Sequence, residues 1–320
     1  MPAALDPILF DNPVWLAPMA GVTDAAFRTL CVEHGARVTV SEMISAKALE
    51  YRNDRTWDMI EPAPAEKAYA VQLFGHEPDV MARQAAAVAE RLADRLAFID
   101  VNMGCPVPKV HKKGEGAALM RTPALAAEII YEMTHALEPY GIAVTAKVRS
   151  GWDASSVNAV EFARILEEAG AAAVGVHGRT AKQLYRGKAD WGVIAQVADA
   201  LTTPVIGSGE VLSHADALRM MDECGTAAAY AARGVRGNPW IFTGYEPNAA
   251  ERIEGARRHL QLYLDFYGEE HLAPLRAQLA FYVRGLPGAT DVRRGLGRAT
   301  TAREFAAILD DAYQRVGGAS

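Results

Sequence analysis

The sequence predicts an α/β protein in which a (β/α)8 barrel, the TIM-barrel fold, is followed by a small all-helical C-terminal domain. Eight short apolar segments, each ending in turn-forming residues, alternate with helical segments between residues 14 and 242. This alternation is typical of a parallel sheet with right-handed crossovers, and eight such units close a barrel. Beyond residue 245 the pattern is helical. We therefore expect a barrel domain at 1–244 and a helical domain at 245–320.

The expected strands are short runs of β-branched and small apolar residues. They are VWLAP (14–18), VTVSEM (38–43), AYAVQLFG (68–75), FIDVNMG (98–104), VTAKVRSG (144–151), AAVGVHGR (172–179), PVIGSG (204–209) and AAAYAARG (227–234). A six-stranded doubly wound sheet is the alternative, and it would require a GxGxxG turn after the first strand. The first turn reads APMAGVTD and lacks that pattern, which favours the barrel.

The helices between the strands carry start signals. We expect helices over 78–93, 122–137, 155–169, 190–201 and 213–223, and another starting at Asp24. Ser213 is a suitable N-cap, and a proline stands near the start of the helix at 78–93. After a short linker near 244–248, the helical domain contains TTAREF (300–305), a Thr-x-x-Glu capping box.

Composition and charge bound the possible functions. The chain has 320 residues, a net charge of −6 and three cysteines without a CxxC pair, which fits a reducing cytoplasm. The sequence contains no run of about 18 apolar residues, so we expect no membrane-spanning helix. The N-terminus lacks the basic and apolar regions of a signal peptide. We expect a cytoplasmic protein without membrane association, and nothing in the sequence predicts a protein partner.

The charge is unevenly distributed along the chain. Residues 246–320 contain ten arginines and ten acidic residues, so the excess of acid lies entirely in the preceding part. Within 276–303, six arginines stand against a single acidic residue, Asp291. The helical domain can therefore present a basic surface to nucleic acid although the whole chain is acidic.

Unusual residues stand where the expected strands end. They are Pro18 and Met19, Glu42, Gln72, Asn102 with Cys105, Lys147 with Arg149, His177 with Arg179, Ser208 to Glu210, and Arg233. Catalytic residues of such barrels lie at the C-terminal ends of the strands, so we expect these side chains to surround one site. No HExxH or i,i+4 histidine pair predicts a metal site, and no GxSxG elbow predicts a serine hydrolase.

The last two strands end in glycine-containing turns, at Gly207-Ser208-Gly209 and at Ala232-Arg233-Gly234. Barrels often bind phosphate at this place through backbone amides, and an arginine adds a charge-assisted contact. Without a Walker-type loop, this phosphate predicts a cofactor such as flavin mononucleotide or pyridoxal phosphate. Two ordinary turns are the alternative.

Lys147 lies within an apolar strand, where lysine is rare without a partner. It could form a Schiff base, stabilise an anionic cofactor, or belong to a structural ion pair. His177 and Arg179 lie two residues apart and would share a face. Both a site role and a core role are open for His177.

Cys105 stands between Gly104 and Pro106, in a turn instead of a packed strand. A buried structural cysteine and a nucleophile are two interpretations. The motif contains no adjacent histidine to act as a base, which favours a third: a thiol with a pKa near 8.5 holds its proton at neutral pH and can act as a general acid.

Several short motifs together resemble the tRNA-dihydrouridine synthases, most closely the bacterial B-type branch. They are APMAGVTD (17–24), QLFG (72–75), NMGCP (102–106), KVRSGW (147–152), VHGRT (176–180), GKADW (187–191), GNPWIF (237–242) and RGLPG (284–288). The resemblance extends from about residue 8 to 310 with the spacing intact. It implies an FMN-binding barrel and a helical tRNA-binding domain.

The resemblance also implies a reaction and its residues. NADPH would reduce a tightly bound FMN, the flavin would pass a hydride to C6 of a uracil in tRNA, and Cys105 would protonate C5. The residues implied for FMN are Pro18, Met19, Ala20, Gln72, Lys147, His177, Ser208, Gly209, Glu210, Ala232 and Arg233. Those expected to contact RNA are Asn102, Lys109, Lys112, Arg149, Arg179, Arg293 and Arg294.

This chain departs from the family pattern at a few positions. Ser208-Gly209-Glu210 replaces a usual Asn-Gly-Asp, Ala232 replaces a glycine, and Ala277-Gln278 replaces a common Lys-His pair. Two other functions stay open. One is an FMN-barrel dehydrogenase acting on a free pyrimidine, and the other is a non-catalytic RNA-binding protein on the same scaffold.

Overall fold

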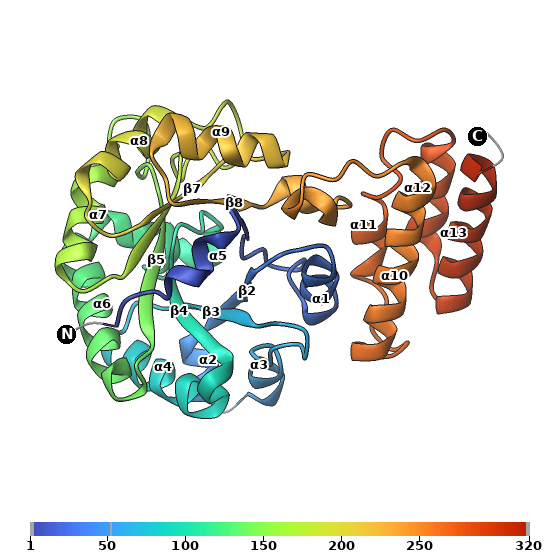
Figure 1. Cartoon of the computed structure of the whole chain (residues 1–320). Helices are drawn as coiled ribbons and strands as arrows, with labels where there is room; N and C mark the ends of the chain where they lie inside the picture. The colour runs from blue at the N-terminus through green and yellow to red at the C-terminus, as the bar shows by residue number, and fades with distance from the viewer. Residues whose placement is uncertain (1–2, 52, 318–320) are drawn as a thin grey trace.

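The computed structural model describes residues 3–51 and 53–317. The first residues of the predicted barrel domain (1–2), the last of the predicted helical domain (318–320) and residue 52 lie outside the described residues. Eight parallel strands form one sheet in the order β1-β8-β7-β6-β5-β4-β3-β2, and β1 contacts β2 across the remaining seam. Helices surround this sheet (Figure 1). The predicted (β/α)8 barrel is confirmed, and the doubly wound alternative is excluded.

All eight predicted strands are present. They are β1 Val14–Leu16, β2 Val38–Ser45, β3 Ala68–Phe74, β4 Leu96–Met103, β5 Ala143–Arg149, β6 Ala173–His177, β7 Val205–Ser208 and β8 Ala228–Ala231. The helices around them are α1 Ala25–Glu33, α2 Ala46–Glu50, α3 Asp54–Asp58, α4 Pro78–Leu92, α5 Pro108–His111, α6 Pro123–Leu137, α7 Ala159–Glu168, α8 Trp191–Ala200 and α9 His214–Cys224. The helix expected near residue 155 begins four residues later, because Gly151 and Val157 form an antiparallel bridge.

The predicted helix caps are present. Asp24 accepts a hydrogen bond from the Phe27 amide at 2.9 Å and starts α1. Ser213 and Asp216 form a reciprocal capping box at α9. Since each cap satisfies amides that the helix leaves unpaired, these residues fix where the helices begin after their strands.

The interior of the barrel is filled at its N-terminal end. Trp15 packs against Phe98 and Tyr230 with ring centroids 5.8 and 6.0 Å away, and its indole donates to the Leu9 carbonyl at 3.1 Å. A separate, larger apolar cluster lies between the sheet and its surrounding helices. With the lower part closed by aromatic rings, the polar residues of the strands gather at the opposite, C-terminal end.

The C-terminal helices are α10 Ala249–Tyr267, α11 Leu275–Leu279, α12 Ala289–Arg298 and α13 Ala302–Gly317. They lie to one side of the barrel, next to α1 (Figure 1). Their apolar core also takes in Ala26 and Leu30 of α1. The predicted capping box is present, since Glu304 and Thr301 exchange hydrogen bonds before α13. Helix α1 thus joins the two parts of the molecule.

Candidate active site

The C-terminal strand ends surround a cavity of about 560 Å³. All eight strands or the loops that follow them contribute to its lining. From the predicted site residues, those that line it are Pro18, Met19, Ala20, Gln72, Asn102, Cys105, Lys147, Arg149, His177, Ser208, Gly209, Glu210, Ala232 and Arg233. The structure therefore places Cys105 and every residue implied for the cofactor around one space.

Cys105 is held by a continuous string of hydrogen bonds that begins inside the barrel. The buried Asp100 carboxylate accepts from Gln72 Nε2 at 2.7 Å, and Gln72 Oε1 accepts from Asn102 Nδ2 at 2.8 Å. Asn102 Oδ1 in turn accepts from the Cys105 amide at 2.9 Å. Both amide side chains have one orientation that satisfies this string, so the backbone of Cys105 is fixed from the core outward.

The protonation state of Cys105 follows from its surroundings. The residue is half-buried and lines the cavity. Burial raises the pKa of its thiol, against smaller opposing effects of a backbone hydrogen bond from Val107 and the charge of Arg149. The thiol therefore keeps its proton at neutral pH, which suits a general acid and not a thiolate nucleophile.

Lys147 projects from β5 with its ammonium 5.4 Å from the centre of the Tyr230 ring. Burial lowers the pKa of Lys147 to about 8, with a further lowering by Arg149 and a partial opposing effect of Asp100. Its ammonium forms no hydrogen bond or ion pair with residues 3–51 or 53–317. A desolvated cation without a bonded carboxylate at a cavity wall favours an anionic ligand.

His177 is a neutral group at the end of β6. Burial, followed by the charges of Lys147 and Arg149, lowers the pKa of His177 to about 2. Its Nδ1 lies 3.2 Å from Ser208 Oγ, while Nε2 is buried without a hydrogen-bond partner in the described part of the chain. A buried ring nitrogen that the protein leaves unbonded is available to a ligand in the cavity.

The predicted phosphate turn follows β7. Gly209 has a φ of 119°, and a Cβ there would lie 2.7 Å from Ala189 Cβ, so a side chain is excluded on both counts. Glu210 also has a positive φ, of 62°. Its carboxylate is used by Arg179 at 2.8 Å, which leaves backbone amides and the exposed Arg233 as the groups for an anion here.

Arg149 and Arg179 brace loops instead of presenting free charges. Arg149 donates to the Gly104 carbonyl at 2.8 Å and to the Thr180 and Leu184 carbonyls at 3.0 Å. Arg179 is 1% exposed and does not line the cavity; it donates to the Gly187 carbonyl at 2.7 Å. Both were expected to contact RNA, and in this structure their donors are mainly occupied by the chain itself.

The other basic residues predicted for RNA lie away from the main cavity. Lys109 lines an adjoining cavity of about 600 Å³ that shares Cys105 with the first, and Lys112 is exposed behind it at the end of α5. Arg293 and Arg294 are exposed on α12, where Arg294 forms an ion pair with Asp291 at 2.8 Å.

Tyr185 and Arg236 also line the main cavity, and the sequence pointed to neither of them as a site residue. Tyr185 is 59% exposed, and the centre of its ring lies 5.8 Å from Arg149 Cζ and 5.5 Å from Arg233 Cζ. The position of Tyr185 depends on the preceding residue, Leu184, which has a positive φ of 54°. No pattern in the sequence predicts this backbone conformation. Arg236 also lines the cavity, and its place three residues after Arg233 was the available signal.

Arg236 connects the active-site cavity to a second cavity of about 550 Å³, lined by residues of the barrel and by residues near the C-terminal helices. Arg252 and Arg284 from the helical side line it, and Glu246 is the single acidic residue in that lining. Arg236 stacks on Phe281, with its Cζ 3.8 Å from the ring centre. For these three arginines and Arg233, the described residues provide no ion pair. We call this set of four the arginine track.

The described residues offer neither a metal site nor a membrane span. They contain no group of three or more His, Cys, Asp or Glu side chains placed to hold a metal ion. Within the same part of the chain, no helix combines the length and apolar character needed to cross a membrane.

Comparison with known proteins places this chain in a family. The family model described as dihydrouridine synthase (Dus) matches residues 15–316. A probable tRNA-dihydrouridine synthase 1 of Synechocystis is 34% identical, covering 97% of this chain and 89% of the relative. A probable tRNA-dihydrouridine synthase of Mycobacterium tuberculosis is 38% identical over 96% and 83% of the two chains.

A relative from Shewanella oneidensis, tRNA-dihydrouridine synthase B, is 36% identical over 83% of this chain and 84% of its own. Among solved structures, histamine dehydrogenase from Rhizobium sp. 4-9 superposes with a TM-score of 0.57 at 12% identity, covering 97% of this chain and 64% of that one, which supports the barrel fold alone. The family match over nearly the whole chain and the identity to full-length relatives agree. This chain belongs to the dihydrouridine synthase family.

Proposed function

We propose that this protein reduces the C5–C6 double bond of specific uridines in tRNA to 5,6-dihydrouridine, in the cytoplasm, with tightly bound FMN and with NADPH as the reductant. Membership of the dihydrouridine synthase family and the names of the relatives support the substrate and the product. The observation that carries the proposal is Cys105, a protonated thiol in the wall of the same cavity as Lys147.

The residues of the cavity fit a flavin mononucleotide. The turn after Ser208 and the exposed Arg233 suit its phosphate, and Lys147 suits a negative charge on the ring system. The unbonded Nε2 of His177 can donate to or accept from a polar ring atom, depending on its tautomer. Pro18, Met19 and Ala20 provide a wall for the ring face.

The chemistry divides between cofactor and protein. A reduced flavin held by these residues would supply the hydride that adds to C6 of the uracil. Cys105 then donates its Sγ proton to C5, so that the charge on the C5–C4–O4 system is quenched as the new C–H bond forms. Water reprotonates the thiolate after the product leaves. Asn102 positions this acid through the Cys105 amide.

A uridine inside folded tRNA must leave its stack to enter such a cavity. The exposed Tyr185 ring at the entrance offers a surface on which a base can stack. The arginine track extends from this entrance to the helical domain, and arginines without carboxylate partners suit a phosphodiester backbone. The tRNA would therefore lie across both domains. Lys109 at the adjoining cavity and the exposed Lys112, together with Arg293 and Arg294 on α12, would extend this surface.

The proposal is tested by incubating the purified protein, loaded with FMN, with NADPH and an unmodified tRNA transcript. We expect dihydrouridine in the tRNA and none from free uridine or uracil. Reduction of the free pyrimidine instead would identify a small-molecule dehydrogenase. A protein that binds tRNA but takes up no flavin would identify a non-catalytic RNA-binding protein.

A further inference from the structure

The loop between β1 and α1, residues 17–24, forms one wall of the active-site cavity through Ala17 to Ala20 and Val22. A compact turn gives it its shape. The amides of Val22 and Thr23 donate to the Met19 carbonyl at 3.1 and 3.0 Å, and the Met19 amide donates to Thr23 Oγ1 at 3.0 Å. Contacts that fix residues 21–24 in place therefore also fix this wall of the cavity.

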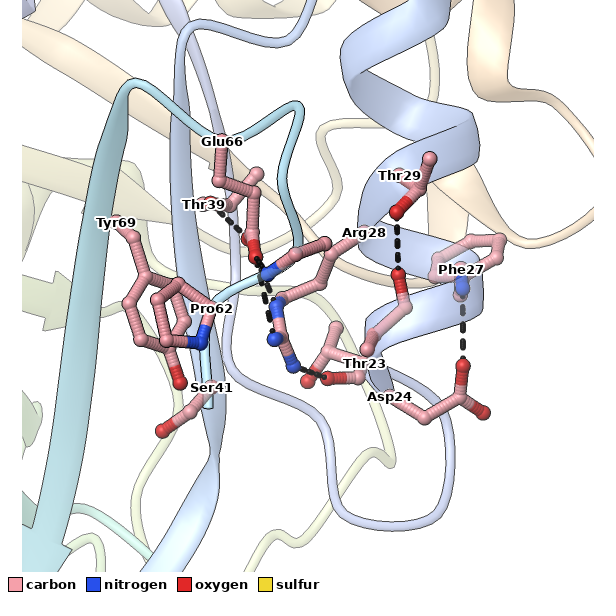
Figure 2. Close-up of polar contacts among 12 residues, drawn as sticks. Thr23, Asp24, Phe27, Arg28, Thr29, Thr39, Ser41, Pro62, Glu66 and Tyr69 are labelled. Carbon is pink, nitrogen blue, oxygen red and sulfur yellow. Dashed lines mark hydrogen bonds and ion pairs between the residues drawn. The ribbon is translucent and has the colours of Figure 1, made fainter. Parts of the chain in front are cut away.

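The barrel holds the loop from below through a buried ion pair, which Figure 2 shows. Arg28 donates to the Thr23 carbonyl at 2.8 Å and to Glu66 at 2.8 and 3.2 Å, and its guanidinium lies 4.8 Å from the centre of the Tyr69 ring. Thr39 also donates to Glu66 at 2.6 Å. Every polar atom of Arg28 that faces the core is thus bonded, which makes this anchor rigid.

The helical domain holds the same loop from the other side. Gln278 in α11 is 7% exposed, and its Nε2 donates to the Gly21 carbonyl and to Asp24 Oδ2, both at 3.1 Å. Tyr267 at the end of α10 accepts from the Ala25 amide at 3.0 Å. These contacts reach the loop and the first turn of α1, directly beside the cavity wall.

Gly21 is hydrogen-bonded both to the barrel and to the C-terminal helices. Its amide donates to the Glu42 carboxylate of the barrel, while its carbonyl accepts from Gln278 of the helical domain. Gly21 has a φ of 72°, a left-handed turn geometry that favours glycine. Since Ala20 and Val22 on either side line the cavity, a shift of α11 must move the wall or break a hydrogen bond.

From these contacts we infer that Gln278 is a positioning residue for the cofactor, and that through it the helical domain sets the shape of the flavin wall and signals the arrival of RNA to it. The inference rests on the proposed function, because it needs a flavin in the barrel and RNA on the helical domain. A positioning residue here acts through Gly21 and Asp24 and does not touch the reacting atoms.

The test compares Gln278→Met, which keeps the side-chain volume and removes the donor, with Gln261→Met, a glutamine on the exposed face of α10. Hydrogen exchange of residues 17–25 is measured in the cofactor-free protein. We expect the Val22 and Thr23 amides to exchange at least about fivefold faster in Gln278→Met, because two hydrogen bonds are lost. Gln261→Met should exchange like wild type, and Tyr267→Phe should give a smaller increase.

The same variants are then loaded with FMN, and the flavin absorbance is recorded as tRNA is added. Wild type and Gln261→Met should show a tRNA-dependent change that Gln278→Met loses while keeping its tRNA affinity within about twofold. Wild-type exchange and a wild-type spectral response in Gln278→Met would overturn this inference and leave the proposed function intact. Wild-type protein that takes up no flavin would overturn both.

Discussion

Gln72 and Asn102 are joined by a hydrogen bond of 2.8 Å in which the amide nitrogen of Asn102 donates to the amide oxygen of Gln72. The direction of this bond is imposed at both ends. On one side the Asp100 carboxylate requires a donor from Gln72, and on the other the Cys105 amide requires an acceptor from Asn102. The proton donor of the proposed reaction is thus placed by a carboxylate buried in the barrel.

Asn102→Asp should break this string without changing its size. The new oxygen would face Gln72 Oε1, so that two acceptors meet where one hydrogen bond stood. We expect the single-turnover rate of dihydrouridine formation to fall by about 100-fold, since small displacements of a catalytic group have effects of this order. Flavin content should stay unchanged. Asn53→Asp, at an exposed helix cap where aspartate serves equally well, is the matched control; equal rates in both variants would contradict the positioning role of Asn102.

Cys105→Ala should separate the two halves of the reaction. The variant keeps the residues that surround the flavin, so it should bind FMN and oxidise NADPH as wild type does. Dihydrouridine formation should fall by about 100-fold or more, the usual contribution of a general acid. Cys224→Ala, which removes a buried thiol outside the cavity, should keep both activities. A Cys105→Ala enzyme that reduces tRNA at the wild-type rate would show that another group donates the proton.

The arginine track should dominate the salt dependence of tRNA binding. Replacing Arg252 and Arg284 with glutamine should weaken binding and lower the slope of log K against log salt by about 0.7 to 0.9 for each lost phosphate contact. The pair Arg293→Gln and Arg294→Gln on α12 should lower it less, because Asp291 already offsets the charge of Arg294. A larger effect of the α12 pair, measured by filter binding between 50 and 200 mM salt, would move the main RNA surface to α12.

The affinity of the cofactor-free protein for reduced FMN, whose ring system carries the negative charge that Lys147 suits, should depend on pH through Lys147. Its pKa of about 8 means that the ammonium is charged below pH 8 and loses its proton above it. An anionic ligand favours the charged form, so affinity should be highest below pH 8 and fall as pH rises to 9.5, by at most about tenfold per pH unit. Lys147→Met should bind more weakly and lose this dependence. Lys67→Met, which removes an exposed lysine, should retain it.

Much of the site could be predicted because the barrel does the assembling. Once eight strands are located from their apolar runs, topology alone brings residues as distant as Met19, Cys105 and Arg233 to one end. The chemical type of each side chain then indicates whether it binds the cofactor or acts as the acid. The turn at Gly209 was predictable for a different reason, because its glycine marks a backbone conformation that other residues avoid.

What the sequence did not reveal is the direction in which a long polar side chain points. Arg149 and Arg179 look like RNA contacts in the sequence, yet they bond to carbonyl groups of neighbouring loops. Conversely, Gln278 stands out in the sequence only as a departure from the Lys-His pair of the family, and yet its amide donates to the Gly21 carbonyl beside the cavity wall. An arginine or glutamine can serve a ligand or its own backbone equally well, and only the tertiary structure decides between these partners.

Helix α1 has a further consequence for any attempt to recombine this protein with its relatives. Phe27 and Cys31 face the core of the barrel, whereas Ala26 and Leu30 face the core of the helical domain. A chimera spliced at the linker near 244–248 would therefore pair a foreign helical domain with a surface of α1 that did not evolve to fit it. To exchange substrate specificity between such enzymes, the residues on one face of α1, more than 200 residues upstream, must be transferred together with the C-terminal segment.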